Sequence, residues 1–204
     1  LALSGGIVAL ERRWPVRAGM ALGLATGLKV SPVLVLVYAV YRRGRRVALG
    51  GAVILALLLA LTLVTGRFTD WQVFAREIAP QLSGGSGSIQ NMSVPGLALR
   101  VAGHGQDRVL ATAVAAIVAV VGFLLVAQQG RYHDSDGLAL ALMTTVALLA
   151  GPISWDHYAT WSLVVVVAGI DSRYWSVTRR TAWPWLQAGA VCAALVPVAY
   201  LSPR

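Results

Sequence analysis

Long apolar runs separated by short polar gaps dominate this sequence. Six runs are almost free of charged side chains: residues 1–10, 18–41, 47–65, 109–127, 138–170 and 183–201. A helix needs about 20 apolar residues to cross a bilayer. The runs at 47–65 and 109–127 fit one crossing each. The pattern therefore predicts an all-α, polytopic helical membrane protein, with residues 1–204 forming a single transmembrane domain.

Two of the runs do not fit one straight crossing. Residues 138–170 are too many for a single span, and Pro152 with the polar group at 154–157 divides them into two helices. The run at 18–41 is flanked by arginines at both ends, and arginine-rich loops stay on the cytoplasmic side. Because Pro32 lacks a backbone donor, we expect a hairpin of two short helices broken at LKVSP. One kinked span with basic flanks on both sides is the alternative.

The charge distribution predicts the sidedness of the chain. The net charge is +9, and sixteen of the seventeen cations are arginines. A basic protein can bind nucleic acid, but these arginines lie in short gaps between apolar runs, which is typical of cytoplasmic loops. We therefore expect a lipid bilayer and no nucleic acid as partner. If the basic loop at 42–46 is inside, residues 66–108 form an extracytoplasmic loop, 128–137 lie inside and the turn at 152–157 lies outside. This describes a multi-pass protein of the plasma (inner) membrane.

The turn SWDHY, at residues 154–158, places polar side chains between two apolar runs. Trp155 suits a membrane interface, and Asp156 is placed to cap the helix that follows. His157 can hydrogen-bond or protonate a phosphate and titrates near neutral pH. The alternative is that these side chains only cap helices and contact interfacial water.

Lys29 is the one lysine in the sequence, and it lies deep in an apolar run. At 1.5 Å per residue it is about 16–18 Å from either basic flank, too far for its ammonium to reach an interface easily. An ionisable group at that depth indicates function. It would face an anionic headgroup or pair with an internal carboxylate.

The long polar segment at 66–108 carries further candidates. Its stretch SIQNMSVPGLALR contains Gln90, Asn91 and Arg100, although an ordinary loop would have a similar composition. FTDWQVFAREI has apolar residues at helical spacing, so we expect a helix along the membrane surface. SGGSGS predicts a flexible hinge, which would let the segment close as a lid. A passive connector is the alternative.

Three stretches resemble the membrane glycosyltransferases of family 87. GLATGLKVSPVLVLVYAVYRRGRRVAL is similar to a characteristic stretch of that family. IQNMSVPGLALR resembles its outer-loop Asn-Ser signature. PISWDHYATW resembles its Ser-Pro-Ile-Ser-Trp-x-His signature, with Gly151 where a serine is frequent. The stretches occur in the family's order, and the resemblance covers most of residues 12–170. The family belongs to the GT-C superfamily and includes actinobacterial polyprenol-phosphate-mannose-dependent mannosyltransferases.

The resemblance implies a GT-C-like bundle that moves a hexose, mannose in the first place, from a polyprenyl-phosphate sugar to a lipid or glycan acceptor with inversion. It implies His157 as a catalytic residue. The residues implied to bind substrate are Lys29, Gln90, Asn91, Arg100, Trp155 and Asp156. The family's catalytic base is an Asp in an outer loop near the N-terminus. We expect that loop to precede Leu1, because the opening LALSGGIVAL resembles the end of a truncated helix and the chain reads as a C-terminal fragment.

The sequence contains no cluster of metal ligands, no phosphate-binding glycine loop and no nucleophile elbow. We therefore expect no cofactor beyond the lipid-linked sugar, which is a co-substrate, and the sequence leaves a divalent metal open. Two other functions remain. A polytopic transporter or lipid-linked sugar flippase subunit also uses broken helices around a cavity. A non-catalytic membrane subunit would tolerate mutation of Lys29 and His157.

Overall fold

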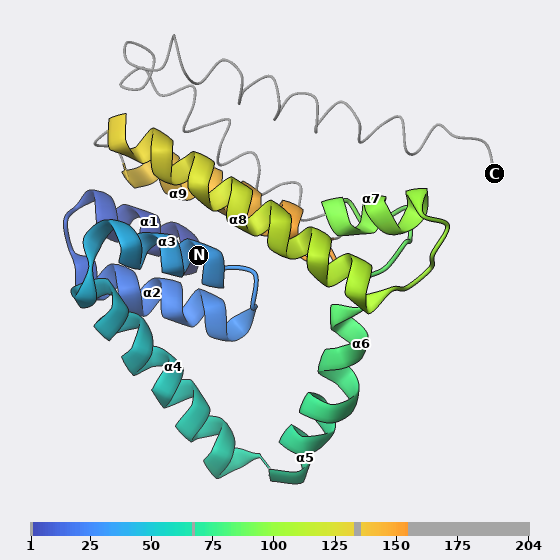
Figure 1. Ribbon diagram of the computed structural model, residues 1–204. Coiled ribbons are helices and arrows are strands. Elements are labelled where there is room, and N and C mark those ends of the chain that lie inside the picture. The colour runs from blue at the N-terminus through green and yellow to red at the C-terminus, as the bar shows by residue number, and fades with distance from the viewer. Residues whose placement is uncertain (1, 67, 133–135, 155–204) are drawn as a thin grey trace.

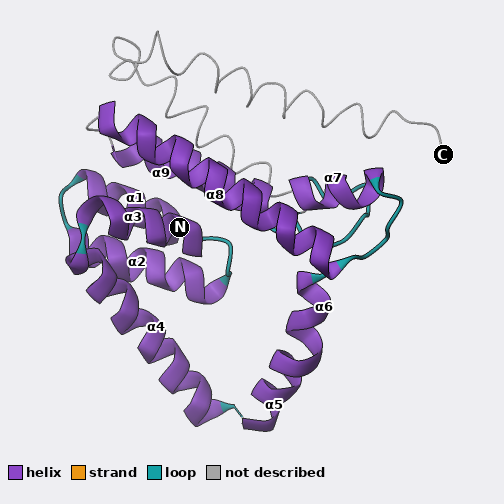
Figure 2. Ribbon diagram, in the orientation of Figure 1, coloured by secondary structure: helices purple, strands orange, loops and turns teal. Residues whose placement is uncertain are grey.

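The computed structural model describes residues 2–66, 68–132 and 136–154, and this part of the chain is helical without a β-strand (Figures 1 and 2). The helices are, in chain order, α1 (Ala2–Glu11), α2 (Pro15–Leu28), α3 (Val33–Arg43), α4 (Arg45–Thr65), α5 (Phe68–Val73), the π-helix η1 (Phe74–Ile78), α6 (Ala79–Ser83), α7 (Val94–Val101), α8 (Arg108–Tyr132) and α9 (Asp136–Ala150). The predicted all-α fold class is confirmed. Trp155, Asp156 and His157 lie outside the described residues.

Helices α4 and α8 are long and apolar enough to cross a membrane. They begin at Arg45 and Arg108, close to the starts expected from the sequence. Only 17% of the apolar window of α4 and 11% of that of α8 is buried. A core helix of a soluble protein is mostly buried, so these exposed apolar surfaces are those of helices that lipid or further protein covers.

Helices α2 and α3 form the hairpin expected around LKVSP. Helix α2 ends at Leu28, Lys29 is extended with φ −153° and ψ 131°, and α3 starts after Pro32. The two helices pack against each other (Figure 1). The start of α2 and the end of α3 line one shared hollow, through Pro15 and Arg43. Both basic flanks therefore lie at the same end of the bundle, which a single kinked span could not achieve.

The backbones of α2 and α4 come into direct contact through glycines. Gly19 and Gly23 are one turn apart on α2, and both are buried. A Cβ atom on Gly19 would collide with the carbonyl oxygen of Val47 and would lie 2.9 Å from the amide nitrogen of Gly51. A Cβ atom on Gly23 would lie 2.9 Å from the carbonyl oxygen of Gly51. Small residues four apart allow this close packing of helices in membranes, where van der Waals contact drives association.

Replacing Gly19 by leucine should therefore separate α2 from α4. Because the obstacle is backbone rather than a flexible side chain, we expect a destabilisation of about 1–3 kcal/mol, the usual cost of overpacking. The measurement is the thermal unfolding midpoint of the full-length protein in detergent. Gly5→Ala is the matched control, since Gly5 is helical and a Cβ there meets nothing within 4 Å. Equal midpoints for the two variants would contradict the close packing.

Helix α8 connects two different ends of the bundle. Its 25 residues span about 37 Å at 1.5 Å per residue. Towards its C-terminal end, Tyr38 of α3 packs edge-on against Phe123 with ring centroids 5.7 Å apart. Helix α7 packs against α8 as well, and Figure 1 shows it beside the N-terminal half of α8. The basic loops therefore gather at one end and the loop before α7 at the other, in the order traced from the sequence. Which end faces the cytoplasm stays a prediction.

A buried carboxylate ties α3 to the start of α9. Asp136 is 3% exposed. It accepts a 2.5 Å hydrogen bond from Nε of Arg43, and its other oxygen lies 3.5 Å from Arg42. Next to it, the Gly137 amide donates a hydrogen bond to Glu11 at the end of α1. A buried carboxylate that loses its cationic partners is strongly destabilising, so this cluster fixes α1, α3 and α9 together. The sequence had placed Asp136 in a polar loop and predicted no such contact.

Candidate functional site

A second cluster of hydrogen bonds is centred on Asn91. It lies at the opposite end of α8 from the Asp136 cluster. The Asn91 side chain is fully buried. The amide nitrogen donates to the carbonyl oxygens of Ser86, at 2.7 Å, and Pro152, at 3.0 Å. The amide oxygen accepts from the backbone N–H groups of Ser93, at 3.2 Å, and Ser154, at 2.8 Å. One side chain therefore joins the loop before α7 to the turn after α9.

Helix α7 starts directly beside this asparagine. The Oγ of Ser93 caps the helix by accepting a 3.0 Å hydrogen bond from the Gly96 amide. Gly96 has to be glycine, because a Cβ there would lie 2.5 Å from the amide nitrogen of Asn91. The sequence analysis did not predict α7 as a helix. The signal was present in Ser93-Val94-Pro95, since serine is a favoured N-cap and proline is favoured in the first helical turn.

Arg100, in the last turn of α7, reaches back to the same loop. One of its guanidinium nitrogens, Nη1, donates to the carbonyl oxygens of Ser88, at 2.6 Å, and Asn91, at 2.9 Å. Charge-assisted hydrogen bonds of this kind are stronger than neutral ones. Arg100 therefore holds the backbone on both sides of Gln90, whose side chain is exposed.

The loop SGGSGS is held in place, whereas its composition indicated flexibility. Gly85 is buried with a left-handed φ of 68°, and the Gly87 amide donates a 2.9 Å hydrogen bond to the Gly105 carbonyl. The carbonyl groups of Ser86 and Ser88 accept hydrogen bonds from the Asn91 and Arg100 side chains. The glycines are needed for conformation and close approach, and the flexible hinge at this loop stays a prediction.

The segment before the loop is helical, as its spacing predicted. Helix α5, η1 and α6 cover residues 68–83, and Phe74 and Ile78 are 42% and 44% exposed. Figure 1 shows α4 leading away from the bundle and this helical segment leading back to α8. Its position on a membrane surface stays a prediction.

The structure brings together some of the predicted site residues and not others. Asn91 and Arg100 lie in one network. This network extends to Ser154, which is the last described residue and directly precedes Trp155-Asp156-His157. A backbone hydrogen bond of 2.7 Å from Met92 to Ser154 adds to this link. Lys29 is half-buried at the tip of the α2–α3 hairpin.

The Asn91 network positions the backbone of two loops, and the polar atoms of its central side chain already bind groups within the protein. Both polar atoms of the Asn91 side chain are hydrogen-bonded within the protein, and Arg100 binds two backbone carbonyls. Together they fix the loop before α7 and the backbone up to Ser154. Among the described residues no group of three His, Cys, Asp or Glu side chains could hold a metal ion.

The fold and the site define a helical membrane protein in which two loop motifs meet at one end of the bundle. Glycosyltransferase family 87 matches residues 1–154, and the chain belongs to this family. This match confirms the resemblance identified from the three sequence stretches. No solved structure matches the chain.

The curated relatives come from mycobacteria. A polyprenol-phosphate-mannose-dependent α-(1-2)-phosphatidylinositol pentamannoside mannosyltransferase of Mycobacterium tuberculosis (strain CDC 1551 / Oshkosh) is 30% identical over 183 residues, covering 85% of this chain and 41% of that protein. A polyprenol-phosphate-mannose-dependent α-(1-2)-phosphatidylinositol mannoside mannosyltransferase of Mycolicibacterium smegmatis is 25% identical over 185 residues, covering 85% of the chain and 41% of that relative. The chain spans about two-fifths of the length of these relatives.

Proposed function

We propose that the full-length protein containing this chain is a membrane mannosyltransferase. It would move mannose from polyprenyl-phosphate-mannose to a lipid acceptor of the phosphatidylinositol mannoside class, on the extracytoplasmic face and with inversion. The observation that carries this proposal is the Asn91 network, which joins two family-like motifs that lie 61–63 residues apart. The donor and acceptor follow from the names of the relatives.

The proposed reaction is a single displacement at the anomeric carbon of the sugar. An acceptor hydroxyl attacks that carbon from the face opposite the phosphate and forms the new glycosidic bond. The bond between the anomeric carbon and the phosphate oxygen breaks, and polyprenyl phosphate leaves with the electron pair. The hydroxyl proton passes to a carboxylate base. Groups aimed at the leaving phosphate stabilise the charge that develops there.

We assign that stabilising part to His157 and Lys29. His157 follows three residues after Ser154, whose backbone N–H donates to Asn91, and this contact would orient the chain that leads to His157. Lys29 lies at the tip of the α2–α3 hairpin, at the end away from the basic loops. Gln90, Trp155 and Asp156 would line the cavity that receives the sugar. Asn91 and Arg100 would keep the two loops in register around it.

The surface of the bundle suits a lipid-linked donor. Leu57 and Leu61 of α4 are 59% and 60% exposed, and Leu124 of α8 is 62% exposed. Exposed leucine side chains can pack against acyl or prenyl chains, because this contact removes no polar group from water. A polyprenyl tail could therefore lie against these helices while its phosphate reaches the loops.

The proposal is tested by sugar transfer in proteoliposomes that contain the full-length protein in one orientation. A phosphatidylinositol mannoside is supplied with either polyprenyl-phosphate-mannose or a nucleotide-linked mannose. We expect transfer from the lipid-linked donor alone, at the extracytoplasmic face, and NMR of the product should show the inverted anomeric configuration. Movement of the donor across the bilayer without transfer would instead support the transporter alternative, to which the broken α2–α3 hairpin is also suited.

A further inference from the structure

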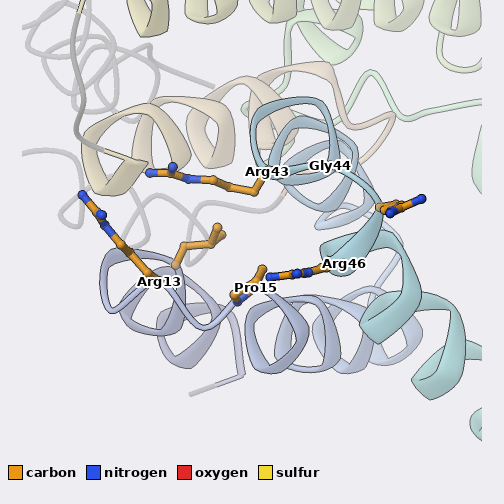
Figure 3. Close-up of a pocket in the computed structure, with 7 residues that line it drawn as sticks. Arg13, Pro15, Arg43, Gly44 and Arg46 are labelled. Carbon is orange, nitrogen blue, oxygen red and sulfur yellow. The ribbon is translucent and has the colours of Figure 1, made fainter.

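A strongly basic hollow lies at the end of the bundle opposite the Asn91 network. It is open to the surface and has a volume of about 530 Å³. Four arginines line it together with two apolar residues: Arg13, Arg43, Arg45, Arg46, Leu10 and Pro15. They come from the α1–α2 loop and from the α3–α4 junction, which the hairpin brings together. Figure 3 shows Arg13 and Arg43 on two sides of the hollow and Arg46 extending towards Pro15.

The charge of this hollow is mostly uncompensated. Arg43 is paired with the buried Asp136, which also fixes its direction. Within the part of the chain that the structure describes, no carboxylate forms an ion pair with Arg13, Arg45 or Arg46. Arginine side chains around one hollow repel one another, so the arrangement favours a bound anion. Guanidinium groups bind phosphate oxygens through paired hydrogen bonds.

The backbone at Arg13 is strained in a way that points to a use for its side chain. Arg13 has a left-handed φ of 58°, and it is the one described residue other than glycine with a positive φ. It follows the end of α1, where the Trp14 amide donates a 2.8 Å hydrogen bond to the Ala9 carbonyl. Glycine is the usual residue at such a helix end. An arginine here costs backbone energy, and a strained residue of this kind suggests function.

Two further features match the phosphate of a lipid. Helix α4 starts at the hollow, after Gly44 with its φ of 75°, so the unpaired amides and positive dipole of a 21-residue helix add to the arginines. One turn further along α4, Leu49 is 60% exposed. On α2, Val16 and Met20 are 40% and 39% exposed. Exposed apolar side chains therefore run directly from the anion site, as acyl chains would require.

We propose that this hollow binds the phosphate headgroup of an anionic phospholipid, with its acyl chains against α2 and α4. The site is separate from that of the lipid-linked sugar, because the two lie at opposite ends of the bundle. Basic pockets between membrane helices on the cytoplasmic side recognise anionic headgroups in this way. The Trp14 ring lies 5.5 Å from the guanidinium carbon of Arg12 and 4.9 Å from that of Arg17, and it would anchor the same edge in the interface.

The test uses the full-length protein in zwitterionic micelles, titrated with short-chain phosphatidylglycerol and followed by native mass spectrometry. The double variant Arg13→Gly/Arg46→Gln removes two cations, and glycine at position 13 relieves the backbone strain. We expect affinity to fall about 30-fold, while the unfolding midpoint without lipid stays equal or rises. Arg76→Gln and Arg108→Gln, which replace exposed arginines outside the hollow, should bind like the wild type.

Two further binding measurements identify the chemical class of the ligand. Arg46→Lys keeps the charge but loses the paired geometry, so its affinity should fall between those of the wild type and the double variant. Glycerol phosphate should bind far more weakly than phosphatidylglycerol, because it lacks acyl chains. Equal lipid binding by the double variant and the wild type would overturn the site. Equal affinity for glycerol phosphate and for the lipid would overturn the lipid as its occupant.

Discussion

Asn91→Leu is expected to destabilise the protein by about 3–5 kcal/mol and to abolish sugar transfer. Leucine has the same branched skeleton of four side-chain heavy atoms and leaves no cavity, so the main effect comes from lost hydrogen bonds. Four backbone groups lose their partner, namely the carbonyls of Ser86 and Pro152 and the amides of Ser93 and Ser154. Each buried group left unsatisfied costs about 1–3 kcal/mol, and such costs are not fully additive.

Thermal unfolding of the full-length protein measures this effect. Gln106→Ala is the matched control, because it also removes a side-chain amide but Gln106 is exposed, and we expect it to unfold like the wild type. Asn91→Asp should be intermediate, since it keeps the acceptor for Ser93 and Ser154 but places a carboxylate against two carbonyl oxygens. An Asn91→Leu variant with wild-type stability would show that the network does not hold the loops.

His157→Ala and Lys29→Met are each expected to lower turnover by a factor on the order of 10²–10³. This is the usual cost of removing one group that stabilises charge in a transition state. Because the phosphate charge grows as the sugar leaves, kcat should fall more than KM rises. The measurement is initial-rate mannosyl transfer by the full-length protein at matched expression, with the unfolding midpoint recorded in parallel.

Two conservative controls make this result specific. His104→Ala removes an exposed histidine from the loop after α7 and should leave turnover unchanged. Lys29→Arg keeps a cation at the hairpin tip and should retain part of the activity. Near-normal turnover in both His157→Ala and Lys29→Met would contradict a role in charge stabilisation and would favour helix capping and internal pairing as the roles of these side chains. The proposed function would then rest on family membership and the Asn91 network.

The sequence predicts those parts of the fold that depend on local pattern. Apolar runs locate α4 and α8 to within a few residues, and Pro32 locates the break between α2 and α3. The return of α3 to the basic end was also predictable, because arginines at both ends of residues 18–41 favour one side of the membrane. These features depend on hydropathy and backbone chemistry. Both are properties of the local sequence and do not depend on which residues make contact in the folded protein.

Contacts between distant residues could not be predicted in the same way. Asn91 and Ser154 were placed in separate motifs, and the buried Asp136 was assigned to a polar loop. Composition also gave no sign of the hydrogen bonds at SGGSGS, because these depend on residues elsewhere in the chain. Gly85 is buried here, and Arg100 binds the Ser88 carbonyl. Which groups meet depends on the packing of helices, and no local pattern contains that information.

The long sequence separation of these contacts sets the order in which the chain can assemble during its synthesis. Asn91 needs Ser154, made 63 residues later, and Arg43 needs Asp136, made 93 residues later. At about 5–20 residues per second, Ser154 and Asp136 are synthesised several seconds after Asn91 and Arg43, with which they form these contacts. Both contacts require α9, so the two ends of the bundle close in the same late step. Until then, the ribosome-bound intermediate carries α4 in the bilayer while the loop before α7 still lacks its partners from the end of α9.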